Sequence, residues 1–165
     1  MKLKKLVRPL IIFMIVITNI GCDQVSKTIV RKSVSYNDRI ELVSDYFTLT
    51  KVENSGAFLS FGDSLSLPVK NIFLSVLPLL TLTIGFIFLL LTPGITNMPL
   101  TGLCFVIGGG IGNIFDRIIY GSVTDFLHID LGIFRTGIFN LADVSIMMGA
   151  FIILIHSFFK RATPC

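Results

Sequence analysis

The sequence contains no tryptophan, only two histidines and three cysteines, and only 15% of its 165 residues are charged. The cysteines, Cys22, Cys104 and Cys165, form no CxxC pair, so neither a disulfide framework nor a zinc site is indicated. His128 and His156 are far apart and have no accompanying ligand set. The sequence therefore predicts no metal site and no cofactor.

Apolar residues are abundant, in contrast to the charged ones. They make up 53% of the chain, and the mean hydropathy is +0.84. A soluble domain of this length could not bury so much apolar surface, so the bilayer is the expected solvent. A helix needs about 20 residues to cross the hydrocarbon. Four apolar stretches approach that length: residues 7–30, 68–92, 99–119 and 138–159.

Lysine and arginine gather at the two ends of the chain, for example at Lys2, Arg8 and Lys160, although the net charge is only +4. This distribution fits membrane orientation better than nucleic-acid binding, because basic residues flank the cytoplasmic ends of membrane helices. Both termini are therefore expected in the cytoplasm, and no nucleic-acid partner is expected. Two cytoplasmic termini require an even number of crossings, which four helices satisfy.

On this topology the short connection 92–98 is cytoplasmic, and residues 31–67 and 120–137 face outward. Arg31 and Lys32 in the first outer segment are a mild exception to the charge rule. We expect residues 1–165 to form a single integral membrane domain.

Alternating residues in both outer segments indicate β-strands. Residues 47–52 alternate apolar or long side chains with shorter ones and are followed by an Asn-Ser-Gly turn at 54–56. Residues 123–132 show a similar alternation. The predicted fold class is therefore a mainly α membrane protein, with four transmembrane helices and a small extracytoplasmic β-sheet.

Carboxylates next to membrane helices are costly to place there and are functional candidates by default. Of the ten acidic residues, four lie close to apolar stretches: Asp23, Asp116, Asp125 and Asp143. On the expected topology all four lie near the outer ends of their helices. Their convergence is more informative than any one of them alone.

The third apolar stretch carries glycines and then polar residues. Gly108 and Gly112 are four residues apart and can form a smooth face for close helix packing. Asn113, Asp116 and Arg117 are spaced i, i+3 and i+4, so they share the next part of the same surface. One interpretation is a packing helix that ends in an Asp116–Arg117 ion pair, and a functional role is the alternative.

The last apolar stretch opens with a capping pattern. If Asn140 is the N-cap, Asp143 occupies the N3 position, where free N–H groups and the helix dipole favour an anion. A lone aspartate there is more often a cap than a catalyst. However, Asp125 follows the third stretch on the same side, so the two carboxylates could meet. Two carboxyl groups that share a water are the minimum for aspartic peptide hydrolysis.

A second kind of peptidase site, the Ser–Lys dyad, is not supported. Ser26 and Lys27 are adjacent and point to different helix faces.

Four blocks of the sequence closely resemble the bacterial lipoprotein signal peptidases, or signal peptidase II, a family of four-helix membrane aspartic peptidases. The blocks occur in the family's order and spacing and lie in all but the second apolar stretch. They are DQVSK at 23–27, NSGAF at 54–58, GNIFDRIIYGSVTDF at 112–126 and FNLADVSI at 139–146.

The resemblance implies that Asp125 and Asp143 are the catalytic pair. It also implies a set of substrate-binding and supporting residues: Asp23, Lys27, Asn54, Gly56, Asn113, Asp116, Arg117 and Asn140. The implied substrates are diacylglyceryl-modified prolipoproteins, cut just before the lipidated cysteine. The implied location is the bacterial inner membrane, with the active site at the outer face, in contact with membrane lipid. We expect a monomer.

Two alternatives compete with this interpretation. A lipoprotein precursor also has a cysteine after a basic leader and an apolar run, as at Cys22. However, Asn19 stands where such precursors usually have leucine, and a secreted lipoprotein would not need three further spans. A small proton-coupled transporter would also use membrane carboxylates, but it would place them near mid-span.

Overall fold

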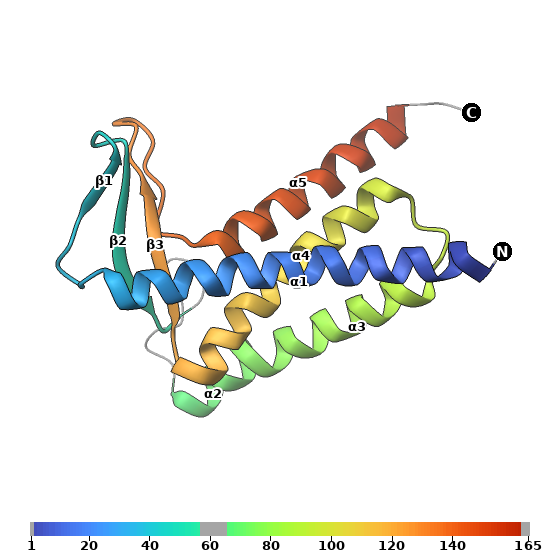
Figure 1. Ribbon diagram of the computed structural model, residues 1–165, viewed down its shortest axis with the longest axis horizontal. Helices are drawn as coiled ribbons and strands as arrows, with labels where there is room; N and C mark the ends of the chain where they lie inside the picture. Colours follow the sequence, from blue (N-terminus) through green and yellow to red (C-terminus); the bar gives the residue numbers. More distant parts are fainter. Residues whose placement is uncertain (1, 57–65, 163–165) are drawn as a thin grey trace.

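The computed structural model describes residues 2–56 and 66–162 and shows a helix bundle with a small sheet at one end (Figure 1). Within the described residues, four helical segments are long and apolar enough to cross a membrane. This arrangement confirms the predicted fold class. The segments are α1 (Lys2–Ser33), the continuous run of α2 (Leu67–Asn71), η2 (Ile72–Val76) and α3 (Leu77–Leu91), α4 (Asn97–Tyr120) and α5 (Leu141–Ala162).

The helix ends follow local sequence signals. Tyr120 is the last residue of α4, because Gly121 adopts a left-handed conformation with φ of 77° that terminates the helix. The last segment was predicted from residue 138, but α5 begins at Leu141, since Asn140 precedes it as a capping residue. The first segment, predicted to residue 30, extends to Ser33.

Helix α4 lies at the centre of the bundle and packs against α1 and α5 through glycines (Figure 1). A Cβ atom on Gly108 would lie 2.7 Å from Cβ of Asn19 in α1. A Cβ atom on Gly112 would lie 2.6 Å from the Asp23 carboxylate, also in α1. The predicted glycine face at Gly108 and Gly112 is therefore confirmed, and it brings the polar residues of α1 and α4 into contact.

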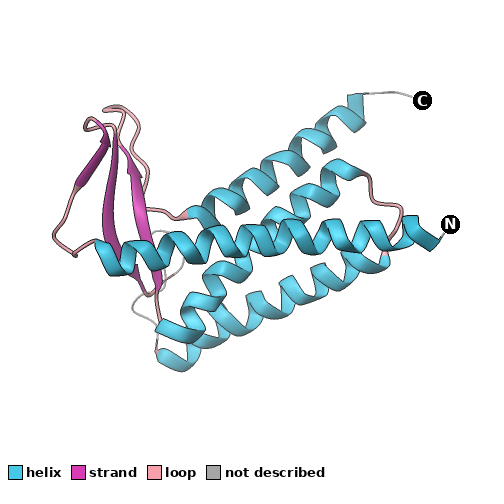
Figure 2. Ribbon diagram, viewed as in Figure 1, coloured by secondary structure: helices cyan, strands magenta, loops and turns pink. Residues whose placement is uncertain are grey.

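The sheet consists of β1 (Ile40–Val43), β2 (Phe47–Asn54) and β3 (Val123–Ile129), in that order and antiparallel (Figure 2). It includes both predicted strands. Apolar residues of β3, of the last turn of α1 and of the position just after it form a small core that fixes the sheet on the helices: Val30, Val34, Phe126 and Leu127.

The start of α1 and the end of α5 both lie at the end of the bundle opposite the sheet (Figure 1). At that end Arg8 Nη2 donates a hydrogen bond of 2.7 Å to the Thr92 carbonyl, at the C-terminal end of α3. The connection between α3 and α4 is therefore on the side of the termini, as expected for an even number of crossings.

Candidate active site

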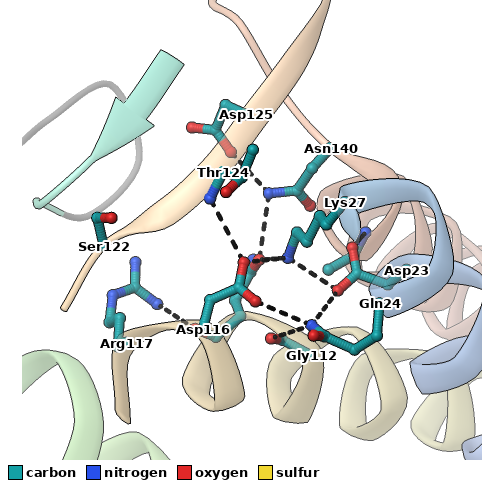
Figure 3. A network of polar contacts seen from close by, with 12 residues as sticks. Asp23, Gln24, Lys27, Gly112, Asp116, Arg117, Ser122, Thr124, Asp125 and Asn140 are labelled. Atoms are coloured by element: carbon teal, nitrogen blue, oxygen red, sulfur yellow. Dashed lines mark hydrogen bonds and ion pairs between the residues drawn. The ribbon is translucent and has the colours of Figure 1, made fainter. Parts of the chain in front are cut away.

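Polar side chains of α1, α4 and β3, together with Asn140 just before α5, meet where the sheet joins the bundle (Figure 3). The bilayer would penalise each of them if it were unpaired. The structure brings together all ten residues selected from the sequence. Ala57 and Phe58 of the NSGAF block lie outside the described residues.

Four charged residues form the first part of this region, which we call the ionic set: Asp23, Lys27, Arg31 and Asp116. Lys27 Nζ lies 2.8 Å from Asp23 Oδ2 and 3.1 Å from Asp116 Oδ2. Arg31 Nη2 lies 2.9 Å from the same Asp116 oxygen. Lys27, Asp23 and Asp116 have no exposed surface, so each charge depends on its partners for compensation.

These ion pairs correct one expectation from the sequence. Within the described residues Asp116 pairs with Lys27 and Arg31 of α1, and not with its neighbour Arg117. Arg117 instead donates from Nη2 to the Gly56 carbonyl at 3.0 Å, and the Gly56 N–H donates to Asn54 Oδ1 at 3.0 Å. Arg117 thus holds the turn after β2, and Gly56 takes part through its backbone.

Hydrogen bonds connect the ionic set to the neighbouring helices. Gln24 Nε2 donates to Asp23, to Asp116 and to the Gly112 carbonyl at 3.0–3.1 Å. The Ala142 N–H, in the first turn of α5, donates to Asp23 Oδ1 at 3.0 Å. The ionic set therefore joins the ends of α1, α4 and α5 at one place.

Asp125 and Asp143 form the second part, which we call the carboxyl pair. Asp125 is on β3 and accepts hydrogen bonds from Asn140 Nδ2 at 2.6 Å and from Asn54 Nδ2 at 3.0 Å. Asp143 accepts from Asn113 Nδ2 at 2.9 Å and from the Asn140 N–H at 3.1 Å. Asn140 contacts both carboxylates, so it sets their relative position.

The start of α5 has the predicted capping arrangement. The Asp143 N–H donates to Asn140 Oδ1 at 3.0 Å, while the Asn140 N–H donates to Asp143 Oδ2. This reciprocal pair is a capping box, and it places the Asp143 carboxylate at the positive end of the helix dipole. The local environment therefore favours negative charge on Asp143.

Asp125 has the opposite environment. Asp125 is only 5% exposed, and burial raises the pKa of its carboxyl from 3.8 to about 6. The charge of Asp143 raises the pKa further, whereas the hydrogen bonds from Asn54 and Asn140 oppose the rise. Within the described residues no lysine or arginine lies within ion-pair distance of either member of the pair. The environment of Asp125 therefore favours the protonated form of its carboxyl.

The sequence analysis missed several members of this region. Arg31 was seen only as an exception to the charge rule, although it stands four residues after Lys27 and eight after Asp23 on one helix face. That spacing could have revealed it. Gln24 gave no such signal, because two of its three acceptors, the Gly112 carbonyl and Asp116, lie on α4.

No group of three or more His, Cys, Asp or Glu residues in the described ranges is arranged to hold a metal ion. The arrangement as a whole can hold one proton between two inequivalent carboxyls. That chemistry is suited to activating a water molecule and protonating an oxygen or nitrogen of a substrate.

The family model and the similar sequences both indicate one protein family. Residues 14–159 match the family described as Signal peptidase (SPase) II. The lipoprotein signal peptidase of Maridesulfovibrio salexigens is 36% identical over 141 residues, which cover 84% of this chain and 88% of that protein. The lipoprotein signal peptidase of Borreliella burgdorferi is 32% identical over 156 residues, which cover 91% of each chain.

The fold also matches a solved structure. A bacterial membrane enzyme superposes with a TM-score of 0.80 at 24% sequence identity, over 92% of this chain and 89% of that one.

Proposed function

The chain belongs to the signal peptidase II family, and we propose that Asp125 and Asp143 are the carboxyl pair with which it carries out that family's reaction. The protein is a multi-pass membrane protease of the aspartic class that removes signal peptides from prolipoproteins. The observation that carries the proposal is the shared contact with Asn140, which holds one buried carboxyl and one helix-capping carboxylate side by side.

In the proposed mechanism Asp143 starts ionised and Asp125 starts protonated. A water molecule attacks the scissile carbonyl carbon, Asp143 takes a proton from that water, and Asp125 gives its proton to the carbonyl oxygen. The C–N bond of the tetrahedral intermediate then breaks. Asp143 passes its proton to the leaving nitrogen, and Asp125 recovers a proton from a hydroxyl of the intermediate. The pair thus ends each turnover in its starting state.

The remaining site residues hold this pair in position. Asn54, Asn113 and Asn140 donate to the two carboxylates and restrict their rotation. Asp23, Lys27 and Asp116 brace the helices from which those amides and carboxylates project. Arg117 and Gly56 anchor the turn that carries Asn54. We assign these eight residues to binding and support, and the two carboxyls to the chemistry.

The substrates are proposed to be diacylglyceryl-modified prolipoproteins, cut just before the lipidated cysteine. The carboxyl pair lies at the end of the membrane-spanning segments, where water can reach it while the acyl chains of a substrate remain in lipid. Much of the binding free energy should then come from buried apolar surface.

We also propose that both termini are cytoplasmic, that the site is at the outer face of the bacterial inner membrane, and that the protein acts as a monomer of one domain. Epitope tags at either terminus should be protected from added protease in cells whose inner membrane is intact and whose outer envelope has been made permeable. A tag inserted between residues 131 and 134 should be digested.

The central test is cleavage of a lipidated precursor, followed as a mobility shift on a gel. Asp125→Asn and Asp143→Asn should each lower turnover by at least about a hundredfold, because an amide cannot exchange the proton. The matched control is Asp45→Asn, since the Asp45 side chain is 84% exposed on the sheet and lies outside the site. An Asp125→Asn enzyme that cleaves at a near-native rate would overturn the proposed pair.

A further inference from the structure

A polar cavity lies on the face of the sheet opposite the carboxyl pair. Asp125 is paired with Val52, and its neighbour Thr124 is paired with Glu53. Because successive residues of a strand point to opposite faces, Thr124 and Glu53 face away from Asp125. The cavity has a volume of about 300 Å³ and is lined by Arg31, Tyr36, Lys51, Glu53, Tyr120 and Ser122.

One cation on this lining, Lys51, lacks a carboxylate partner. Lys51 is only 9% exposed, yet its ammonium has only a 3.4 Å contact with the Arg31 carbonyl and the face of the Tyr36 ring at 4.3 Å. Within the described residues no carboxylate lies within ion-pair distance of it. Buried lysines are almost always paired with an anion. Nη1 of Arg31 is also buried without a hydrogen-bond partner.

One carboxylate lines the same cavity without neutralising Lys51. Glu53 accepts hydrogen bonds from the Ser122 hydroxyl at 2.6 Å and the Thr124 hydroxyl at 2.8 Å. It stands two residues after Lys51 on β2, so the cavity has a cation and an anion side by side along one strand. A ligand that carries both an anionic and a cationic group would complement this lining better than a simple anion.

The depth of the cavity in the bilayer indicates where such a ligand comes from. The span of α1 ends at Ser33 and the span of α4 ends at Tyr120, so the cavity lies at the end of two membrane helices. Tyrosine is enriched at the headgroup level of membranes. Two of the three tyrosines in the chain, Tyr36 and Tyr120, line this cavity. At this depth the charged groups that can enter the cavity are those of phospholipid headgroups.

We propose that this cavity binds the headgroup of a zwitterionic phospholipid with a primary ammonium, of the phosphoethanolamine type. The phosphate lies against Lys51 and the guanidinium of Arg31, and the ammonium donates to Glu53. The bound headgroup supplies the anion that Lys51 lacks.

The test is native mass spectrometry of the full chain in detergent, titrated with three phospholipids that have the same acyl chains. Phosphatidylethanolamine should bind roughly tenfold more tightly than phosphatidylglycerol, which has no ammonium, and than phosphatidylcholine, whose ammonium cannot donate. Inorganic phosphate in a parallel titration should compete weakly. Equal binding of the three lipids, or full competition by inorganic phosphate, would overturn the headgroup assignment.

Variants locate the binding to this cavity. Lys51→Met should weaken phosphatidylethanolamine binding by roughly tenfold, since it removes a charge-assisted hydrogen bond. Lys32→Met is the matched control, because Lys32 is exposed at the same end of α1 and does not line the cavity. Glu53→Gln should retain phosphatidylglycerol binding and lose the preference for ethanolamine. A Glu53→Gln protein with the native preference would contradict the proposal even if Lys51→Met failed to fold.

Discussion

Two pairs of carboxylates lie close together at the sheet end of the bundle, and they are compensated in different ways. In the ionic set, Asp23 and Asp116 contact Lys27, and Asp116 also contacts Arg31. In the carboxyl pair, Asp125 and Asp143 are held mainly by side-chain amides, and no described cation lies within ion-pair distance of either. The first arrangement pairs each carboxylate with a cation, and the second holds its two carboxyls with neutral amide donors.

This difference separates a structural role from a chemical one. The carboxylates of the ionic set are engaged in salt bridges within α1 and between α1 and α4, whereas the carboxyl pair is held by neutral donors. An amide donor holds a carboxyl in position with a much smaller electrostatic effect. We infer that the membrane enzyme uses salt bridges to fasten its helices and amides to aim its catalytic groups.

The largest expected effect comes from making the carboxyl pair resemble the ionic set. Asn54→Lys would place an ammonium close to Asp125, where Asn54 Nδ2 now donates at 3.0 Å. The cation should stabilise ionised Asp125 and remove the acid, which should lower turnover by about a hundredfold to ten-thousandfold. Activity should recover in part at acid pH.

The measurement is turnover of a soluble lipopeptide across pH. Asn54→Ala is the control, since it removes the same hydrogen bond without adding a charge and should reduce turnover less. Equal losses in the two variants, with the same pH dependence, would mean that the cation does not act through the proton on Asp125.

The next effect concerns stability and belongs to the ionic set. Lys27→Met leaves buried Asp23 and Asp116 without their shared cation, and removal of one partner from a buried ion pair typically costs about 3–5 kcal/mol. Asp125→Asn, by contrast, breaks no ion pair among the described residues and keeps the shape of the side chain, although its amide nitrogen cannot accept one of the two hydrogen bonds. It should therefore cost less stability than Lys27→Met.

Denaturant unfolding of the purified protein in detergent compares the two variants directly. If Lys27→Met were as stable as the native protein while it lost turnover, Lys27 would have a chemical role, and the separation between the two carboxylate groups would fail.

A smaller effect is expected in the pH dependence of stability. The pKa of Asp125 is about 6 in the folded protein and 3.8 in the reference state. The folded state therefore binds this proton more tightly than the unfolded state does. The resulting stabilisation is fully present below pH 3.8, falls as the pH rises through 6, and is on the order of 3 kcal/mol.

Melting temperatures of the native protein and of Asp125→Asn, measured from pH 4 to 8, should converge or cross as this contribution is lost. The kcat/KM of the native enzyme should fall over the same upper range, where the pair loses its shared proton. A difference in melting temperature that does not vary with pH would contradict the raised pKa of Asp125.

The sequence predicted those parts of the site that depend on spacing along one element. Asn140 and Asp143 are three residues apart, and the capping box between them was expected from that spacing. The contact of Asn54 with Asp125 joins residues that are 71 positions apart, and no local pattern encodes it. Only the family resemblance brought Asn54 into the predicted set.

The failure at Asp116 has the same cause. Helix spacing placed Asp116 beside Arg117, and an ion pair between them was one interpretation. The observed partners, Lys27 and Arg31, come from α1, which approaches α4 closely because Gly108 and Gly112 have no side chains. Sequence periodicity shows which residues share a face, but packing decides which face of another helix they meet.

The smallest expected effect is at Cys22, which is adjacent to Asp23 in α1 but exposed on the outside of the bundle. Asp23 has no exposed surface and contacts Lys27 at 2.8 Å. The two neighbouring residues therefore differ in both burial and charge pairing. Cys22→Ser should leave turnover unchanged and alter the free energy of unfolding by less than about 0.5 kcal/mol. The serine hydroxyl can donate to a backbone carbonyl one turn earlier, which avoids an unpaired polar group in lipid.

Asp23→Asn serves as the contrast, because it weakens the buried ion pair and should lower stability. Cleavage assays and unfolding in detergent measure both properties. If Cys22→Ser lost cleavage activity at a normal protein level, the side of α1 that carries Cys22 and faces away from the bundle would have to contact the substrate.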